Sequence, residues 1–163
     1  MTDNEFISRI TEKVAEIQKC VSRVMPVKAG RMAKEHFQEN FLLGGFVDGG
    51  LEKWTPAKRL GGTVEDEDGN VKHIPPAKGA KGKYKTLMSS RNNMYDSIEY
   101  TVSDAEVVIE DDVEYAAVHN EGLHAGRGKG FTMPKRQFIG KSEELDEAIN
   151  EMIEKELTKI LEL

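Results

Sequence analysis

Apolar residues recur at three- and four-residue steps in the first part of the chain. Over residues 3–24 this stripe predicts one amphipathic helix, because such steps place side chains on one helix face. Its apolar members are Phe6, Ile10, Val14, Ile17, Val21 and Val24. Thr2 or Asp3 can cap the start, and Pro26 stops the helix or marks a new beginning. A helix of roughly 33 Å, at about 1.5 Å per residue, either lies across the whole domain or projects toward a neighbour.

Two further segments follow the same rule. A less regular stripe predicts a helix from Lys28 to Leu43, ended by Gly44 and Gly45, since glycine adopts the left-handed conformation of a C-cap. Residues 142–161 give the clearest helix, with Ser142 as N-cap and an acidic first turn that suits the positive end of the helix dipole. Its stripe consists of Leu145, Ile149, Met152, Ile153, Leu157, Ile160 and Leu161.

Between these helices the apolar period shortens to two. Residues 97–103 alternate as a half-buried strand does, and residues 105–110 follow after a turn near Ser103-Asp104. Residues 115–119 suit a third strand or a short helical turn. Short consecutive strands joined by tight turns imply antiparallel pairing.

The stretch from residue 46 to 90 has a different composition. Trp54, the only tryptophan, follows a glycine-rich turn and is typical of an anchor that ties a loop to the core. Residues 63–74 predict a small hairpin that turns at Asp68-Gly69. The four acids at 65–68 look like a calcium loop, but they lack the alternating spacing of an EF-hand, so we do not expect a metal ion there.

A basic, glycine-rich run covers residues 75–85. It can bury little apolar surface, so we expect it to be mobile in an isolated monomer. As a contact arm it would touch nucleic acid or an acidic partner, such as the acidic face of the last helix across a subunit boundary; the alternative is a solvated loop. The arm's lysines are Lys78, Lys81, Lys83 and Lys85.

Together these elements predict an α+β fold in a single domain over residues 1–163. Long N-terminal and C-terminal helices would pack on a small antiparallel β-sheet. Extended, mobile loops are expected at about 55–90 and 120–133. A chain of 163 residues is long enough to bury a real core.

Charge and cysteine content narrow the function. The net charge of −6 argues against general affinity for nucleic acid, although a local basic patch is compatible with it. Cys20 is the only cysteine, which excludes an intramolecular disulfide and a cysteine zinc cage. The first residues lack the apolar core of a signal peptide, and no apolar run approaches the ~20 residues of a membrane span. We therefore expect a soluble protein made in a reducing cytoplasm.

The segment from Tyr115 to Gly140 carries the candidate chemistry. His119, Glu121 and His124 could supply metal ligands, which would make the chain a small metal-dependent DNA nuclease. Gly122 lies between the histidines and disfavours a helix that would bring them to one face. Neither an HExxH motif nor a nucleophile elbow occurs, so we expect no catalytic, cofactor-binding or metal-binding residues. A nucleic-acid-binding module that uses the basic loop is a further alternative.

A structural role explains the same segment better than catalysis does. A strand would end at His119, and a glycine-rich excursion would follow. Met133-Pro134 would bring the chain back in extended form, since a residue before proline avoids the helical region. Phe138 and Ile139 would then anchor the start of the last helix.

The order of several short motifs carries a family signal. FLLGG at 41–45 leads to Trp54, YAAVHNEG follows at 115–122, and PKRQFIGKS at 134–142 precedes the last helix. In this order the chain resembles the phage virion morphogenesis proteins, the tail-completion family related to the Mu-like G protein. That family has a "YA..H..G" segment before a "P.R.F.G.S" segment. The matching residues are Tyr115, Ala116, His119, Gly122, Pro134, Arg136, Phe138, Gly140 and Ser142.

The resemblance extends from about residue 41 onward, and one motif departs from it. The Thr-Gly expected before the first strand is absent from residues 89–97. What the resemblance implies is a non-enzymatic virion component that completes the tail or joins it to the head. Trp54 and the motif residues would then serve the fold and assembly.

The resemblance also implies partners and a location. Related folds form rings, commonly hexameric, around the passage for DNA. The expected partners are other copies of the chain and tail-tube or head–tail connector proteins, with transient DNA contact in the lumen and no membrane. The expected location is the tail or the head–tail junction of the virion, after synthesis in the cytoplasm of a bacterial host.

Overall fold

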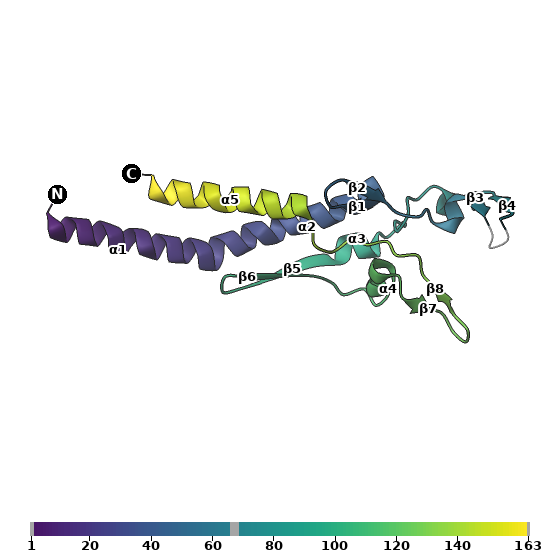
Figure 1. Cartoon of the computed structure of the whole chain (residues 1–163). Helices are drawn as coiled ribbons and strands as arrows, with labels where there is room; N and C mark the ends of the chain where they lie inside the picture. The colour runs from purple at the N-terminus through teal and green to yellow at the C-terminus, as the bar shows by residue number, and fades with distance from the viewer. Residues whose placement is uncertain (1, 66–68, 163) are drawn as a thin grey trace. The chain divides into compact units, whose positions relative to one another are not determined.

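The computed structural model describes residues 2–65 and 69–162 (Figure 1). Contacts divide the chain into two compact units. Unit 1 comprises Met1–His36, Glu99–Glu110 and Lys141–Leu163, and unit 2 comprises Phe37–Ile98 and Asp111–Gly140. The prediction of a single domain stays a prediction.

Unit 1 begins with a helix that changes its period instead of ending. Thr2 caps α1 (Asp3–Lys19) by a capping box, in which its hydroxyl accepts from the Glu5 N–H at 3.4 Å and its own N–H donates to the Glu5 carboxylate at 2.7 Å. A π-helical segment, η1 (Cys20–Val24), continues directly into α2 (Met25–Leu43). Pro26 is the second residue of α2, directly after this π-helical segment, so the helix runs through it. A stop at Pro26 was wrong, and the predicted new beginning takes the form of a change in helical period.

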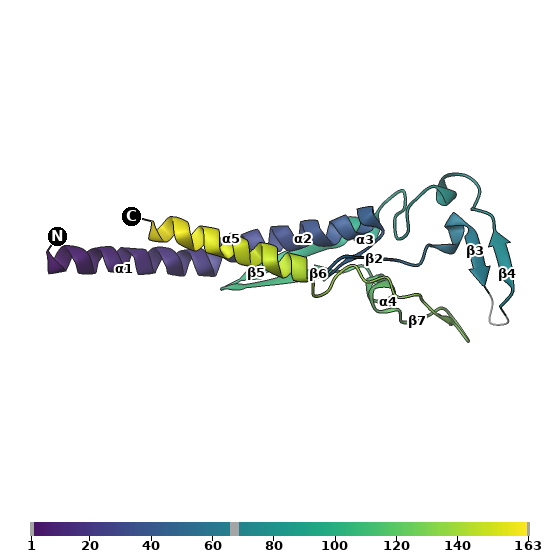
Figure 2. The ribbon, with the colours of Figure 1, turned by 45° about the horizontal axis from the view of Figure 1, so that its top comes forward.

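The other elements of unit 1 pack beside these helices. α5 (Glu143–Leu161) starts at Ser142, whose hydroxyl accepts from the Leu145 N–H at 3.3 Å, as the sequence predicted. It runs beside α1 and the first part of α2 (Figures 1 and 2). Glu156 of α5 pairs with Lys28 at 2.8 Å.

One strand pair completes unit 1. β5 (Ile98–Ser103) pairs with β6 (Glu106–Asp111), close to the predicted bounds. Lys34 of α2 forms an ion pair with Glu99 of β5 at 2.8 Å. Gly30 leaves room for the ring of Tyr100, because an added Cβ would collide with it. This close approach holds β5 against α2.

Unit 2 consists of short elements. α2 ends where Gly44, with a positive φ of 72°, donates its N–H to the Asn40 carbonyl at 2.9 Å. The remaining elements are β1 (Gly45–Val47), β2 (Leu51–Lys53), η2 (Lys58–Leu60), β3 (Gly62–Glu65), β4 (Val71–Ile74), η3 (Ala80–Gly82), α3 (Asn93–Ser97), α4 (Ala116–Glu121), β7 (His124–Ala125) and β8 (Phe131–Thr132).

The α+β class is confirmed, but two details of the prediction were wrong. The strands in the described residues form four separate two-stranded pairs and not one sheet. Of the two forms predicted for residues 115–119, the short helical one is observed, as α4 (Ala116–Glu121), so the strand that was expected to end at His119 does not exist. Short strands at 45–53 and 124–132 were missed, because runs of two or three residues leave no readable alternation.

The hairpin predicted at 63–74 is confirmed by the pairing of β3 with β4, in which Thr63 faces His73. The acids at 66–68 and the Asp68 half of the predicted turn lie outside the described residues.

Aromatic rings form the core of unit 2. Phe41 is fully buried, and its ring centroid lies 4.9 Å from that of Phe138, 5.6 Å from that of Trp54 and 6.0 Å from that of Tyr95. The Trp54 indole N–H donates to the Gln137 carbonyl at 2.8 Å. Trp54 therefore ties its loop to the core, as the sequence predicted. This core holds the second motif segment, at Gln137 and Phe138, against Trp54 and Phe41.

Candidate functional site

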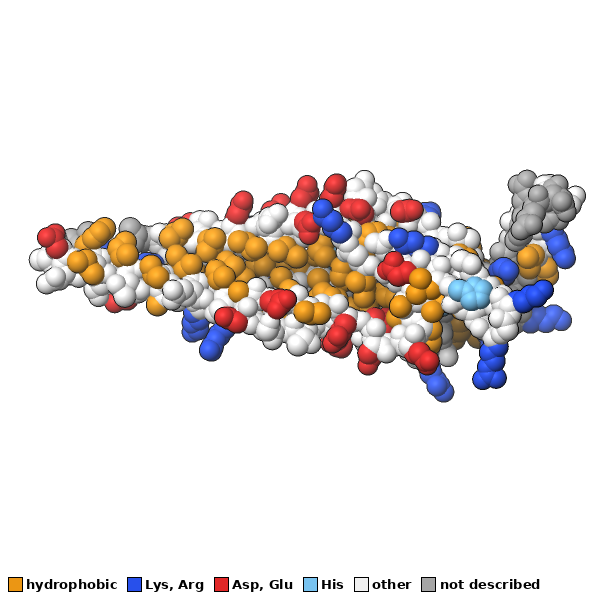
Figure 3. Space-filling view, turned by 60° about the horizontal axis from the view of Figure 1, so that its bottom comes forward, with side chains coloured by type: hydrophobic (Ala, Val, Ile, Leu, Met, Phe, Trp, Pro, Cys, Tyr) orange, Lys and Arg blue, Asp and Glu red, His pale blue; other side chains and the backbone are white. Residues whose placement is uncertain are grey.

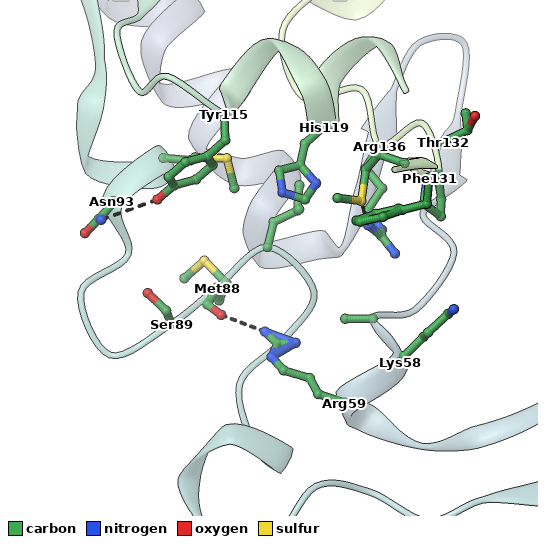
Figure 4. A pocket seen from close by; sticks show the side chains of 15 residues that line it. Lys58, Arg59, Met88, Ser89, Asn93, Tyr115, His119, Phe131, Thr132 and Arg136 are labelled. Atoms are coloured by element: carbon green, nitrogen blue, oxygen red, sulfur yellow. Dashed lines mark hydrogen bonds between the residues drawn. The ribbon is translucent and has the colours of Figure 1, made fainter. Parts of the chain in front are cut away.

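A pocket of about 690 Å³ opens in unit 2 (Figure 4). Its walls come from three stretches of chain, within residues 57–59, 87–94 and 115–136. Four residues singled out from the sequence line it: Tyr115, His119, Pro134 and Arg136. The two motif segments therefore converge on one cavity, although eleven residues, 123–133, lie between Gly122 and Pro134 and include the hairpin of β7 and β8.

Helix α4 presents Tyr115 and His119 to the pocket. Residues four apart lie on one helix face, and their rings meet edge to face with centroids 6.2 Å apart. The Tyr115 hydroxyl accepts from the Asn93 side-chain amide at 3.4 Å (Figure 4). Gly122 ends α4 with a positive φ of 70°, and a Cβ there would lie only 2.9 Å from the Cβ of Lys135. Glycine is thus required for both the turn and the close approach.

Asn120 connects α4 to the second motif, and the sequence analysis missed its role. Its side-chain oxygen accepts from the N–H groups of Phe138 and Ile139, at 2.8 and 3.0 Å. Its side-chain amide donates to the Ile139 carbonyl at 3.1 Å. Its position inside the YAAVHNEG motif was a signal, but the spacing alone does not say which side chains bond across the loop.

Arg136 lies in the pocket wall and holds a neighbouring loop by hydrogen bonds. Its side chain is buried, with Nε donating to the Thr55 carbonyl at 2.8 Å and Nη2 to the Pro56 carbonyl at 3.4 Å. Burial, and then the charge of Arg59, lower the pKa of Arg136. The hydrogen bonds to backbone carbonyls hold the loop after Trp54 in place. The guanidinium therefore serves the fold and is not aimed at an anion.

Arg59 is bonded in the same way. One of its terminal nitrogens, Nη2, donates to the carbonyls of Lys85 and Met88, both at 2.7 Å (Figure 4). The Arg59 carbonyl in turn accepts from the Ala77 N–H at 2.8 Å. These bonds fasten both ends of the basic run to η2.

His119 has an unusual environment. Its Nδ1 is buried and has no hydrogen-bond partner among the described residues. Burial, and then the charge of Arg136, lower the pKa of His119, so the ring stays neutral at neutral pH. A neutral imidazole can accept a proton or a metal ion. A partner carboxylate would be needed for His119 to act as a catalytic base, and further ligands would be needed for it to hold a metal ion.

The structure does not assemble such a set. Among the described residues, no group of three His, Cys, Asp or Glu side chains is placed to hold a metal ion. His124 lies on β7 and Glu121 is exposed on α4, so neither joins His119 in the pocket wall. The alternative of a metal-dependent nuclease built from these three residues gains no support.

The remaining predicted residues lie elsewhere in unit 2. Trp54 and Phe138 belong to the aromatic core, and a Cβ on Gly140 would collide with the Gln137 side chain. Lys78, Lys81 and Lys83 are exposed around η3. Lys85 differs, because its ammonium group donates to the Leu42 carbonyl at 2.7 Å, at the C-terminal end of α2. Three of the four lysines are therefore available for a contact arm, whose mobility stays a prediction.

Most of the pocket surface is apolar. Met88, Met94 and Met133 contribute to its wall, and Phe131 of β8 stands at its edge with about half of its surface exposed. Methionine side chains adapt to ligands of different shapes. In Figure 4 the Phe131 ring lies beside Arg136. This arrangement suits the binding of an apolar group better than catalysis.

Comparison with known proteins gives one match. Residues 52–158 match the phage virion morphogenesis family, a range that contains both motif segments and every residue of the pocket. No curated protein and no solved structure matches the chain. Within residues 2–65 and 69–162, none of the helices combines the length and the apolar character that crossing a membrane requires.

Proposed function

Since the chain belongs to the phage virion morphogenesis family, we propose that it completes the phage tail and makes the tail competent to join the head. It acts by binding other copies of itself and the tail-tube or connector proteins beside it. Its place in the particle is then the end of the tail, at the junction with the head.

The observation that carries the proposal is the pocket on which the two motif segments converge. Its arginines are bonded to backbone carbonyls, and its wall is largely apolar and rich in methionine. A surface of this kind suits apolar contact with a neighbouring protein segment. A structural role agrees with this chemistry and with the family.

Inactivation of the gene in an inducible phage, followed by electron microscopy of the lysate, tests this function. We expect full heads and separate tails, with tails of irregular length or open ends, and loss of infectivity. Wild-type protein supplied in trans should restore joined particles. Complete, infective particles without the gene would overturn the proposal. Tails of normal length with closed ends that still fail to join would restrict the role to head–tail joining.

Phe131 offers a variant that tests the pocket itself. Phe131→Glu places a carboxylate at the apolar edge, so we expect it to fail in restoring joined particles. Leu51→Glu adds the same charge at an exposed apolar side chain of β2 that does not line the pocket. It should restore them. Equal restoration by both variants would show that the pocket edge takes no part.

A contact between the basic run and DNA in the lumen is a separate part of the proposal. It is supported by the exposure of Lys78, Lys81 and Lys83. Replacing these three lysines by glutamine keeps Lys85 and its bond to α2, which a deletion of residues 76–85 would remove. Unchanged infectivity of the triple variant would rule out the contact.

A further inference from the structure

The charged residues in the pocket wall all carry the same sign. Lys58, Arg59 and Arg136 line the pocket, and none of the described residues in its wall is Asp or Glu. The chain as a whole has 29 acidic and 23 basic residues, so this wall departs from the average surface. On the face shown in Figure 3, Lys and Arg side chains also gather on the part of unit 2 that carries β3 and β4. The pocket is therefore a positively charged site in an acidic chain.

The two arginines keep their charge although both are bonded to backbone carbonyls. A carbonyl group has no net charge, and neither guanidinium group forms an ion pair within residues 2–65 and 69–162. Their charge reaches neighbouring groups: burial, and then the charge of Arg136, lower the pKa of His119. Burial, and then the charge of Arg59, lower the pKa of Arg136. A negative group that enters the pocket therefore meets an attractive potential.

Lys58 is the cation best placed to contact such a group directly. Its side chain is exposed on η2 and forms no ion pair with any described residue. In Figure 4 the side chains of Lys58 and Arg59 lie on the side of the pocket away from α4. A carboxylate bound on this side would pair with the Lys58 ammonium group, while Arg59 adds attraction without giving up its bonds to the chain.

The other walls suit an apolar group. Met88, Met94 and Phe131 contribute apolar surface, and the volume of about 690 Å³ lies within the roughly 300–1,000 Å³ that is usual for ligand pockets. Such a volume accommodates a large side chain together with its neighbours in an extended segment. Because the wall combines apolar surface with cations, a complementary occupant has an apolar group and a negative charge close together.

We propose that the pocket binds a segment of a partner protein in which a large apolar side chain lies next to an Asp or Glu. The apolar side chain packs against the methionines and Phe131, and the carboxylate pairs with Lys58. A segment with Lys or Arg at that position is rejected, because three cations would oppose it. The inference rests on the proposed function in taking the occupant to be a neighbouring protein, and it adds the chemistry by which that neighbour is recognised.

Selection of a displayed library of random twelve-residue peptides on the purified full chain tests the inference. We expect enrichment of a large apolar residue beside Asp or Glu. In a synthesised peptide from this set, changing the acid to its amide should weaken binding about five-fold, as should Lys58→Gln in the protein. Added salt should weaken binding to the wild type and have little effect on Lys58→Gln, since salt screens the pair. Phe131→Glu should weaken binding at least about ten-fold, because it puts a carboxylate where the apolar group packs.

Lys72→Glu is the matched control for Lys58→Glu. Lys72 is exposed on β4 and does not line the pocket, so its variant should bind the peptide like the wild type. Lys58→Glu should instead prefer a peptide whose acid is replaced by lysine, which would show that the variant is folded and that the two positions meet. An unchanged fluorescence of Trp54 provides a second check on folding.

Four results would each overturn the inference: no enriched peptide, enrichment without an acid, equal binding by Lys58→Glu and the wild type, or binding that Phe131→Glu leaves unchanged. Tighter binding of decanoate than of any peptide would overturn the choice of a protein segment as the occupant. The proposed function could hold in all these cases, because the particle phenotype tests it separately. Complete particles formed without the gene would remove the proposed function even if the peptides bind as expected.

Discussion

Unit 2 buries Phe41, Trp54 and Phe138 in a closed core, whereas α1 of unit 1 leaves its apolar side chains in solvent. The contrast is clearest between two phenylalanines: Phe138 is 1% exposed and Phe6 is 49% exposed. Around Phe138 the backbone is fixed by Asn40, whose side-chain amide donates to the Phe138 carbonyl at 3.1 Å. Phe6 lies in α1, where no residue is buried. A fold that can build a tight core in one unit does not need an exposed apolar stripe in the other for its own stability.

The difference assigns the two regions to different tasks. The core of unit 2 fixes the geometry of the pocket, because Phe138 and Trp54 hold the chain on both sides of it. The stripe on α1 contributes little to the stability of the single chain, because it lies in solvent. Substitutions should therefore separate the two, with large effects on the stability of the chain in unit 2 and small effects in α1.

The largest expected effect is that of Phe138→Ala compared with Phe6→Ala. Loss of a buried phenylalanine costs about 3–5 kcal/mol of unfolding free energy, since the transfer of the ring and the cavity both count. Replacing an exposed phenylalanine changes the unfolding free energy by less than about 0.5 kcal/mol. Urea unfolding of the dilute protein, followed by the fluorescence of Trp54 in the same cluster, measures the first. A comparable loss of unfolding free energy in Phe6→Ala would show that α1 is packed in the monomer. It would contradict the contrast between the two phenylalanines.

Asn120→Ala should have the next largest effect. It leaves the N–H groups of Phe138 and Ile139 without their acceptor, at a cost of about 1–3 kcal/mol. Asn93→Ala is the matched control, because Asn93 is exposed and its bond to Tyr115 is long, at 3.4 Å. Thermal unfolding of both variants compares them. Equal melting temperatures would mean that Asn120 does not hold the two motif segments together.

The sequence was most informative where local rules decide the structure. Thr2, Ser142 and Gly44 form the helix ends that their residue types predict, because a cap depends on a few neighbouring residues. The hairpin at 63–74 was found for the same reason. Trp54 was correctly placed as an anchor, since a tryptophan between loops needs a core to bury its ring.

Tertiary contacts decided the rest. The pattern of YAAVH fits a strand or a short helical turn, and α4 forms because Asn120 and Gly122 end it against the 135–139 segment. The pocket joins residues up to about 80 positions apart, and nothing in the spacing shows that Arg59 and Arg136 would be bonded to carbonyls. The apolar stripe of α1 was visible in the sequence. Its exposure was not, because periodicity shows which face is apolar and not what covers that face.

A smaller change in stability is expected at Lys85, which differs from the other lysines of the basic run in its bond to the end of α2. Lys85→Met removes a cation from the C-terminal end of α2, where such a charge contributes about 0.3–1 kcal/mol. Lys83→Met removes the same charge from an exposed position nearby and should leave stability unchanged. Urea unfolding at low salt shows the difference best, since salt screens the interaction. If both variants unfold alike, Lys85 belongs with the other lysines as part of a contact arm.

The smallest effect we expect is a pH dependence that comes from His119. Its pKa lies below the ordinary value of 6.5 in the folded protein, because burial and then the charge of Arg136 disfavour the imidazolium. As pH falls below 6.5, the unfolded chain takes up the proton first, so this contribution to stability is lost. His119→Gln should flatten the fall in melting temperature on acidification, whereas His124→Gln, at an exposed position on β7, should leave it unchanged. An equally steep fall in His119→Gln would mean that the closed environment of unit 2 does not extend to the pocket wall.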